Sequence, residues 1–405
     1  MKQKLRRIIR WEFLWLCLIL ITTLAMRFSV AGSIEGPILD EVYYAGHFDK
    51  KHGDLEFGNA HSILVLQKDA RPEHPPLGKL FVAAGVKILG DNEWGWRVPS
   101  IIMGTISIAL FFFICRRLGM SRLGVNLATF LFAFENMTFM LGSIAMLDVF
   151  FVTFMLAFFL LYLHRRYILS GIFIGLSAAA KLFGVMGAPS LLIHWLFTRQ
   201  KHSRWFAATV IAAPIAFLAA VTLFDFVIAR QFVNPIDRIK DMLTLSGSLT
   251  FYNVEHPNMS RPWEWLLNFR PMGFWYGPFP TTWLGGYTAA VSLAVWPLIV
   301  PLVLYMAYRA AKGSDAGLFG LAWFIGTFIL WIPISIATNR VSFIFYFYPT
   351  LGAFCLGLGM ALAELIGWLK NRRKRVKIPI WAGICLILLV HIATLVVLTP
   401  IFIRG

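Results

Sequence analysis

Two adjacent carboxylates, Asp40 and Glu41, follow the first long apolar run of the sequence. Successive side chains on a helix point about 100° apart, so one carboxylate can act as a base while the other binds substrate. A helix-capping Asp followed by a solvated acid is the commoner explanation of an isolated Asp-Glu pair. The pair is therefore a candidate catalytic site whose importance depends on the residues that accompany it.

Residues 73–79 (EHPPLGK) lie in the same polar segment as this pair. The two prolines predict a stiff, extended approach to a short apolar helix over residues 77–89. His74 and Lys79 are candidate substrate ligands, and we expect Lys79 at the depth of lipid headgroups, where a phosphate can reach it. A His-Pro-Pro turn by itself is common, but the whole string of residues 73–79 is much less common.

Arg97 begins the second apolar run. An Arg at a helix end either extends its charge to the membrane interface or binds an anion with its planar fork, and both explanations stay open. Three further ionisable residues lie within apolar runs, where such groups usually face a cavity or a partner. A buried ion pair and a contact with substrate explain them equally well; they are Glu135, Asp148 and Lys181.

Later segments add aromatic and cationic candidates. Residues 260–265 (SRPWEW) supply Arg261 and Trp263, and Arg340 ends a late apolar run. Trp is common at membrane interfaces, but its ring also stacks on sugar faces. The two guanidinium groups are candidate phosphate ligands.

The composition identifies a membrane protein. Of 405 residues, 59% are hydrophobic and 14% are charged, with a mean hydropathy of +0.71, whereas soluble domains carry about 25% charged residues. Runs approaching the roughly 20 residues of a membrane span predict an all-α polytopic protein with a single domain, residues 1–405. The eleven predicted spans are 11–31, 97–115, 123–141, 143–163, 167–184, 186–198, 205–228, 286–308, 317–337, 342–368 and 378–402.

The formal net charge of +17 raises the question of nucleic-acid binding. Each of the short turns between alternate predicted spans, however, is basic: 116–122, 164–166, 199–204, 309–312 and 370–377. This pattern is typical of cytoplasmic loops, so we expect no nucleic-acid partner. The N-terminus is predicted to be cytoplasmic and the C-terminus external, in a multi-pass protein of the cell membrane surrounded by lipids.

Two long segments, 32–96 and 229–287, are then external. The first carries half of the chain's 20 acidic residues. Its short helices, predicted over 41–48 and 77–89, are expected to lie at the membrane surface. No His- or Cys-rich spacing indicates a metal site.

The acidic pair, the cationic side chains and the aromatic residues named above together favour an enzyme that acts on a lipid-phosphate substrate at the outer membrane surface. A carboxylate would deprotonate an acceptor hydroxyl, which attacks the sugar carbon opposite the phosphate. Cationic side chains would hold the phosphate, so no cofactor is required, although the residues leave a divalent cation open.

The motifs resemble those of the protein O-mannosyltransferases that use dolichyl- or polyprenyl-phosphate mannose. The resemblance rests on Asp40-Glu41 with Tyr43, on 74–79 (HPPLGK), on Trp96-Arg97, and on 144–148, 180–181, 260–265 and 340–343 in the expected order. It implies a GT-C fold with eleven spans and inversion at the sugar. It also implies that Asp40 is the catalytic base, that Glu41 supports acceptor or donor, and that Arg97 helps hold the donor phosphate or the loop around it.

The chain also departs from this family. Ser143 stands where many members carry Arg, and residues 345–347 (FYF) replace Tyr-His-Tyr. The absence of a MIR domain between the seventh and eighth spans indicates a prokaryotic member. Sugar and acceptor therefore stay open. A transferase of the same fold that glycosylates lipid, like the aminoarabinose transferases, is a second hypothesis. A transporter or flippase is a third, but the inverted repeats expected of it are not visible.

Overall fold

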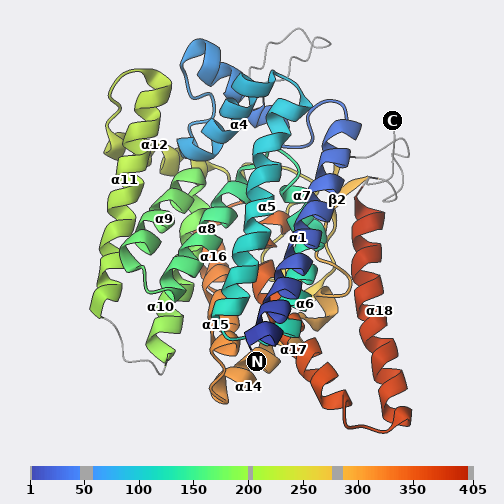
Figure 1. The fold of residues 1–405 in the computed structure, drawn as a ribbon. Coiled ribbons are helices and arrows are strands. Elements are labelled where there is room, and N and C mark those ends of the chain that lie inside the picture. Colours follow the sequence, from blue (N-terminus) through green and yellow to red (C-terminus); the bar gives the residue numbers. More distant parts are fainter. Residues whose placement is uncertain (1, 46–57, 199–203, 276–285, 400–405) are drawn as a thin grey trace.

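A bundle of tilted helices forms the body of the protein (Figure 1). The computed structural model describes residues 2–45, 58–198, 204–275 and 286–399. The N-terminus lies at one end of the bundle, while the C-terminus and the segment that carries the Asp40 and His74 motifs lie at the opposite end. The architecture is mostly helical, as predicted, with one short two-stranded sheet that the all-α prediction did not include, and one continuous apolar core runs from the first helix to the last.

Two classes of apolar helix build the bundle. Among the described residues, six helical segments are long and apolar enough to cross a membrane: Trp11–Ser33 of α1 (Lys2–Ser33), α5 (Glu93–Arg117), Arg204–Ala229 with α11 (Ala207–Ala229), Asp315–Thr338 with α15 (Asp315–Phe324) and α16 (Trp331–Thr338), Ile344–Leu369 with α17 (Tyr348–Leu369), and α18 (Lys374–Leu398). Five are apolar but shorter: α6 (Arg122–Ala133), α8 (Leu147–Leu163), α9 (Tyr167–Ala180), Leu182–Phe197 with α10 (Ala188–Phe197), and Trp296–Ala311 with α14 (Ile299–Ala311).

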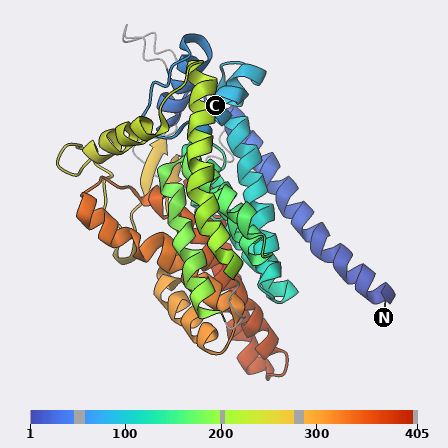
Figure 2. The same cartoon turned by 90° about the vertical axis from the view of Figure 1, so that its left-hand side faces the viewer.

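Short elements connect these helices. They are α2 (Glu41–Tyr44), α3 (Asn59–His61), α4 (Pro76–Leu89), α7 (Asn136–Leu141), α12 (Pro235–Ser248), α13 (Glu264–Leu267) and the antiparallel strands β1 (Met272–Trp275) and β2 (Tyr287–Ala289). The helix predicted over 41–48 is described only as far as Tyr44, because residues 46–57 lie outside the described part of the chain. Figure 2 shows that α12 runs across the bundle rather than along it.

Each predicted span overlaps one apolar helix, but two boundaries were wrong. The predicted span 286–308 starts with β2, and its helix begins only at Trp296. The span predicted over 123–141 is broken at Glu135, whose carboxylate caps α7 by accepting a hydrogen bond from the Thr138 amide at 2.9 Å. The same carboxylate accepts from the Ser292 amide at 3.1 Å. The number of membrane crossings stays a prediction.

The two ends of the bundle differ in charge. Glu12 in α1 lies 3.4 Å from Arg116 and 4.0 Å from Arg122, so α1 begins beside the basic turn between α5 and α6. The basic turn between α17 and α18 lies at this same end (Figure 1). This arrangement agrees with the alternation that the sequence predicts; which end faces the cytoplasm stays a prediction.

Helix α4 packs into the bundle through glycines. A Cβ atom on Gly78 would lie 2.8 Å from the carbonyl oxygen of Ala180, and one on Gly85 would lie 2.2 Å from that of Gly95. Close helix approach through small residues is the usual packing mode of membrane helices. Helix α4 therefore rests directly on α5 and α9, and the His74 turn at its start is held against the end of α9.

We expect Gly85→Ala to lower stability by about 1–3 kcal/mol, because the new methyl group cannot fit against the α5 backbone. Thermal unfolding of the purified protein in detergent, followed by tryptophan fluorescence, measures the change. Gly367→Ala in α17 is the matched control, since its Cβ would meet no atom within 4 Å. Equal unfolding temperatures for the two variants would contradict this packing.

Candidate active site

Glu41 and Arg97 form a fully buried ion pair. The Arg97 guanidinium donates from Nη2 to Glu41 Oε2 at 2.9 Å and from Nε to Oε1 at 3.1 Å. Its other hydrogen bonds go to backbone carbonyl oxygens, of Ala31 at 2.9 Å, Ile34 at 2.7 Å and Gly36 at 2.6 Å. The guanidinium therefore joins the end of α1 to α2 and α5.

The Glu41 carboxylate is equally occupied. It also accepts from the backbone amides of Ile38 at 2.8 Å and Ala145 at 2.7 Å. Both groups are buried and bonded to each other and to the backbone, so Arg97 holds the loop around Asp40, which is the second of the two roles expected for it, and a direct contact of Glu41 or Arg97 with substrate does not fit this geometry. They fix the position of Asp40 instead.

Asp40 is the member of the acidic pair that stays free to react. It occupies the N-cap position of α2, but its side chain makes no capping hydrogen bond. Burial raises the pKa of the Asp40 carboxyl to about 6, opposed by the positive charge of Lys181 and reinforced by the negative charge of Asp148. A half-buried carboxylate that is ionised at neutral pH is suited to accept a proton.

Lys181 and Asp148 form the ion pair that their burial suggested. The Lys181 ammonium donates to both carboxylate oxygens of Asp148 at 2.9 Å. Its nitrogen also lies 5.0 Å from the ring centroid of Tyr346. Glu135 takes no part, because it caps α7.

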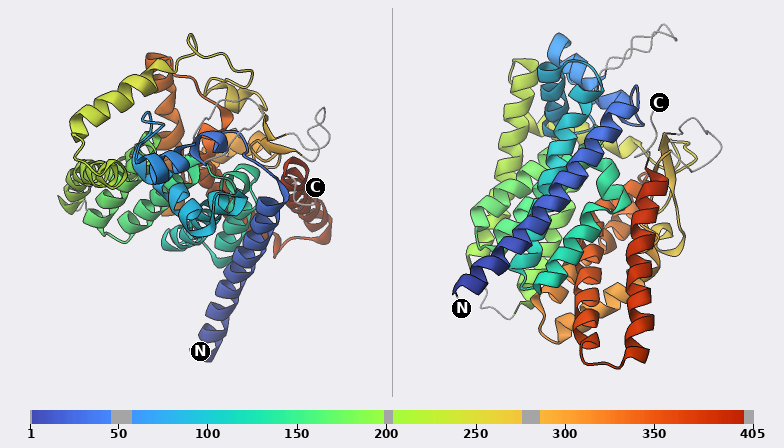
Figure 3. Two further views of the ribbon diagram at one scale, coloured as in Figure 1. Left: turned by 90° about the horizontal axis from the view of Figure 1, so that it is seen from above. Right: turned by 45° about the vertical axis from the view of Figure 1, so that its right-hand side comes forward.

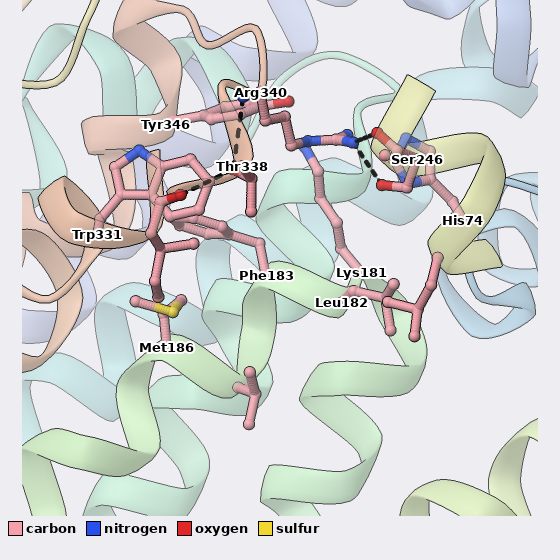
Figure 4. A pocket seen from close by; sticks show the side chains of 14 residues that line it. His74, Lys181, Leu182, Phe183, Met186, Ser246, Trp331, Thr338, Arg340 and Tyr346 are labelled. Carbon is pink, nitrogen blue, oxygen red and sulfur yellow. Dashed lines mark hydrogen bonds between the residues drawn. The ribbon is translucent and has the colours of Figure 1, made fainter. Parts of the chain in front are cut away.

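A cavity of about 280 Å³ adjoins Lys181. Its polar lining residues are His74, Lys181, Ser246, Gly247, Thr338, Arg340 and Tyr346, and its apolar lining residues are Leu182, Phe183, Val185, Met186, Leu243, Trp331 and Ile334. Figure 4 shows the Lys181 and Arg340 side chains between His74 and Ser246 on one side and Trp331 on the other. The cavity thus combines cationic groups with an apolar wall.

His74 contributes a neutral group to this cavity. Burial lowers the pKa of His74 well below its usual value, and the nearby charges of Lys181, Lys79, Arg340 and Arg238 lower it further. The imidazole is therefore uncharged at neutral pH and can donate one hydrogen bond. The sequence prediction that His74 lies in a substrate pocket agrees with its place in the cavity lining.

Lys79 is bound inside the protein. Its fully buried ammonium donates to Asp69 at 2.5 Å and to the carbonyl oxygens of Arg71 and His74 at 2.8 Å each. Asp69 binds this charge inside the protein, so the ammonium is not exposed to a phosphate, while its expected position at headgroup depth stays a prediction. Lys79 fixes the His74 turn and does not line the cavity.

The segments that carry Arg261 and Arg340 lie side by side. The Ser260 amide donates to the Ser342 carbonyl at 3.0 Å, and Ser342 Oγ donates back to the Ser260 carbonyl at 2.8 Å. Arg340 lines the cavity and donates to the carbonyl and hydroxyl oxygens of Ser246. Arg261 donates to Asn339 and does not line the cavity.

Two aromatic candidates also lie outside the cavity lining. Trp263 is 5.8 Å, ring centroid to Cζ, from the Arg261 guanidinium. Tyr43 is 41% exposed, and the Arg71 guanidinium covers its ring at 4.3 Å. In the part of the chain that the structure describes, no group of three or more His, Cys, Asp or Glu side chains is placed to hold a metal ion.

Removing one partner of the buried pair should unfold the site. We expect Arg97→Met to lower stability by about 3–5 kcal/mol, because it leaves the Glu41 charge buried without a partner. The double variant Glu41→Gln/Arg97→Met should lose less than the two single variants together, which denaturation in detergent measures. Arg116→Met is the control, because the Arg116 side chain, which pairs with Glu12, is partly exposed. Additive losses of stability in the double variant would refute the coupling between Glu41 and Arg97.

Sequence comparison finds relatives across most of the chain. The family model described as dolichyl-phosphate-mannose-protein mannosyltransferase matches residues 73–228, from the His74 turn to the end of α11. A polyprenol-phosphate-mannose–protein mannosyltransferase of Mycobacterium tuberculosis is 23% identical over 87% of this chain and 81% of its own length. One from Mycolicibacterium smegmatis is 34% identical over 149 residues, which is 35% of this chain and 28% of that protein.

Solved structures share the fold. The protein O-mannosyltransferase Pmt1-Pmt2 complex of S. cerevisiae, bound to the sugar donor, superposes with a TM-score of 0.66 at 10% identity, over 96% of this chain and 90% of that one. ArnT from Cupriavidus metallidurans gives 0.53 at 17% identity, over 92% and 63%. The GT-C fold implied by the motifs is thus confirmed. In sequence and in fold, the chain is therefore similar to the protein O-mannosyltransferases.

Proposed function

We propose that this protein is an inverting transferase that moves a sugar, most simply mannose, from a polyprenyl-phosphate donor to Ser and Thr hydroxyls of proteins. The observation that supports the proposal is the cavity, which is lined by cationic side chains and an apolar wall, and whose Lys181 interacts electrostatically with the carboxylate of Asp40. A polyprenyl phosphate has the matching combination of a charged head and an apolar tail. Relatives named for polyprenol-phosphate mannose support this choice of donor.

Arg340 is the main phosphate ligand in this proposal. The Lys181 charge is already balanced by Asp148, whereas the hydrogen bonds of Arg340 go to the neutral oxygens of Ser246 and leave its charge uncompensated. A phosphate between Lys181 and Arg340 would receive charge-assisted hydrogen bonds from both. Neutral His74 adds one further donor without repelling a cation. The apolar wall around Trp331 takes the first units of the lipid.

Asp40 serves as the base. It takes the proton of the acceptor hydroxyl while the hydroxyl oxygen attacks the anomeric carbon of the sugar. The new glycosidic bond forms as the bond between that carbon and the phosphate oxygen breaks, so the configuration inverts once. The polyprenyl phosphate leaves with its negative charge held by Lys181 and Arg340. The proposed reaction needs no cofactor, because donor, base and cations complete it.

The charge distribution supports an orientation for this chemistry. The basic turns between α5 and α6 and between α17 and α18 lie at the end of the bundle where α1 begins, and the segment between α1 and α4 lies at the other end. The positive-inside rule then puts the N-terminus in the cytoplasm and the reaction at the external face of the cell membrane.

A lipid acceptor is the alternative. The similarity in fold to ArnT, which also matches 92% of this chain, is the reason to test a lipid acceptor. A transfer assay that offers a Ser/Thr-rich peptide and a lipid A acceptor side by side, each with polyprenyl-phosphate mannose, decides between them. Labelled peptide supports the proposal, and labelled lipid alone establishes the alternative.

We expect Asp40→Asn to lower the transfer rate by about 10²–10⁴-fold, because an amide cannot accept the hydroxyl proton. Binding of the polyprenyl-phosphate donor and the unfolding temperature should stay near wild-type values. Asp237→Asn removes an exposed carboxylate, 65% accessible, and is the matched control. Normal turnover by purified Asp40→Asn would exclude Asp40 as the base.

The pH dependence follows from the raised pKa of Asp40. Since the base must be ionised, the transfer rate should fall as the pH drops through about 6 and reach a plateau above it. The logarithm of kcat/KM measured from pH 4.5 to 8.5 reports this limb for the free enzyme. An acid limb near the ordinary carboxylate pKa of about 4 would show that Asp40 is not buried in solution as it is here.

A further inference from the structure

A cluster of four charges, three of them buried and one partly buried, lies next to the cavity, and of its members the sequence singled out only Lys79. Two cations, Lys79 and Arg238, alternate with two carboxylates, Asp69 and Asp225. They come from the first long loop, α4, α11 and α12, so a single cluster ties four distant parts of the chain together. Equal numbers of opposite charges, each hydrogen-bonded, make such burial tolerable.

Arg238 is the centre of this cluster. Its Nη2 donates to Asp69 at 2.8 Å and to the His74 carbonyl at 3.1 Å, and its Nε donates to Asp225 at 3.2 Å. Its Nη1 donates to the carbonyl of Pro72. One side chain of α12 therefore binds α11 and both ends of the tight turn that carries His74.

The His74 carbonyl receives two cations. Lys79 donates to it at 2.8 Å from within α4, and Arg238 donates to it from α12. Burial would raise the pKa of Asp69, but Lys79 and Arg238 hold it below its usual value, so Asp69 stays ionised as the common partner of both cations. The backbone of the turn is thus fixed while its imidazole is left to face the cavity.

The far end of α12 forms part of the cavity itself. Leu243, Ser246 and Gly247 line it, and Arg340 donates to Ser246 from the opposite segment. Figure 4 shows His74 and Ser246 next to each other on one side of the cavity. Seen from above in Figure 3, α12 extends from the end of α11 toward the C-terminal helices as a separate arm. Apart from Arg238 and Met242, its side chains are at least partly exposed, so few contacts hold it.

We propose that Arg238 is a positioning residue for the lipid-phosphate donor. It holds α12 and the His74 turn together as one wall of the cavity, and so fixes the distance between the His74 imidazole and the apolar side chains of α12. The inference rests on the proposed function, because it takes the cavity to be the donor site. It concerns donor binding and leaves the proton transfer at Asp40 untouched.

The geometry requires a guanidinium rather than a simple positive charge. Arg238 meets four oxygen acceptors in three directions through a planar fork, whereas an ammonium on a shorter stem cannot reach all of them. A lysine at this position would keep the charge balance of the cluster and lose most of the positioning. Arg238→Lys therefore separates positioning from electrostatic neutrality.

The test compares purified full-length Arg238→Lys and Arg238→Gln with wild type. We expect both variants to raise the KM for polyprenyl-phosphate mannose. Arg238→Gln should raise it by about tenfold or more, which corresponds to the loss of at least one charge-assisted hydrogen bond. The kcat should stay within about threefold, because Asp40 and the cations on the phosphate are intact. Lys240→Gln, on the same helix with a 72% exposed side chain, should leave both constants unchanged.

Hydrogen exchange supplies a readout that does not depend on transfer. Amides of α12 should exchange faster in Arg238→Gln than in wild type or Lys240→Gln, while amides of α8 and α9 keep their protection. An unchanged KM, with or without a fall in kcat, would overturn the inference. Unchanged hydrogen exchange in α12 would overturn it as well. If Arg238→Gln does not fold, Arg238→Lys decides on the same criteria.

Binding of undecaprenyl monophosphate separates failure of the inference from failure of the proposed function. A wild-type protein that binds this probe but transfers no sugar refutes the proposed function, and the Kd of Arg238→Lys then tests the positioning role directly. A wild-type protein that does not bind the probe overturns both. Unchanged Kd in both Arg238 variants, with normal transfer by wild type, overturns the positioning role alone.

Discussion

The buried pair of Glu41 and Arg97 is the interaction on which the rest of the site depends. A charge inside a helical bundle is costly unless it is paired and fully hydrogen-bonded, and here both groups are. The backbone groups that complete the pair belong to the end of α1 and to the turn before α8. Because Glu41 is fixed by these contacts, its neighbour Asp40 is placed beside the Lys181–Asp148 pair without bonds of its own to the helix end.

The sequence predicted the parts of this structure that depend on local patterns. Apolar runs located the helices, and the motif around Asp40 located the carboxylate that stays free. The sequence could not predict which charges pair, since Arg238 binds Asp69, which lies 169 positions away in the chain. The pairing of Lys79 was missed for that reason, because an isolated Lys at a helix start looks exposed until its partner is known. The break at Glu135 was hidden by the apolar residues on both sides.

The structure also divides the ionisable groups into two kinds. Glu41, Arg97 and Lys79 have all their hydrogen-bonding capacity committed to each other, to Asp69 or to the backbone, so they stabilise one arrangement of the loop. Arg340 and Asp40 do not meet an opposite charge at hydrogen-bond distance among the described residues. Such uncompensated groups beside a cavity cost stability and are the ones available to a substrate.

The balance of charge at the cavity explains why this arrangement suits a phosphate leaving group. Lys181 and Asp148 are neutral as a pair and His74 is uncharged, so among the residues that line the cavity only Arg340 has an unbalanced charge, while the carboxylate of Asp40 lies near Lys181. A donor that carries one negative phosphodiester charge would neutralise it. When the sugar leaves, the phosphate gains a second charge, which Lys181 can share only by loosening its contact with Asp148. In the proposed reaction Asp40 becomes neutral when it takes the proton of the acceptor, so one negative charge near Lys181 disappears as the phosphate gains one, and the net charge of the site stays the same.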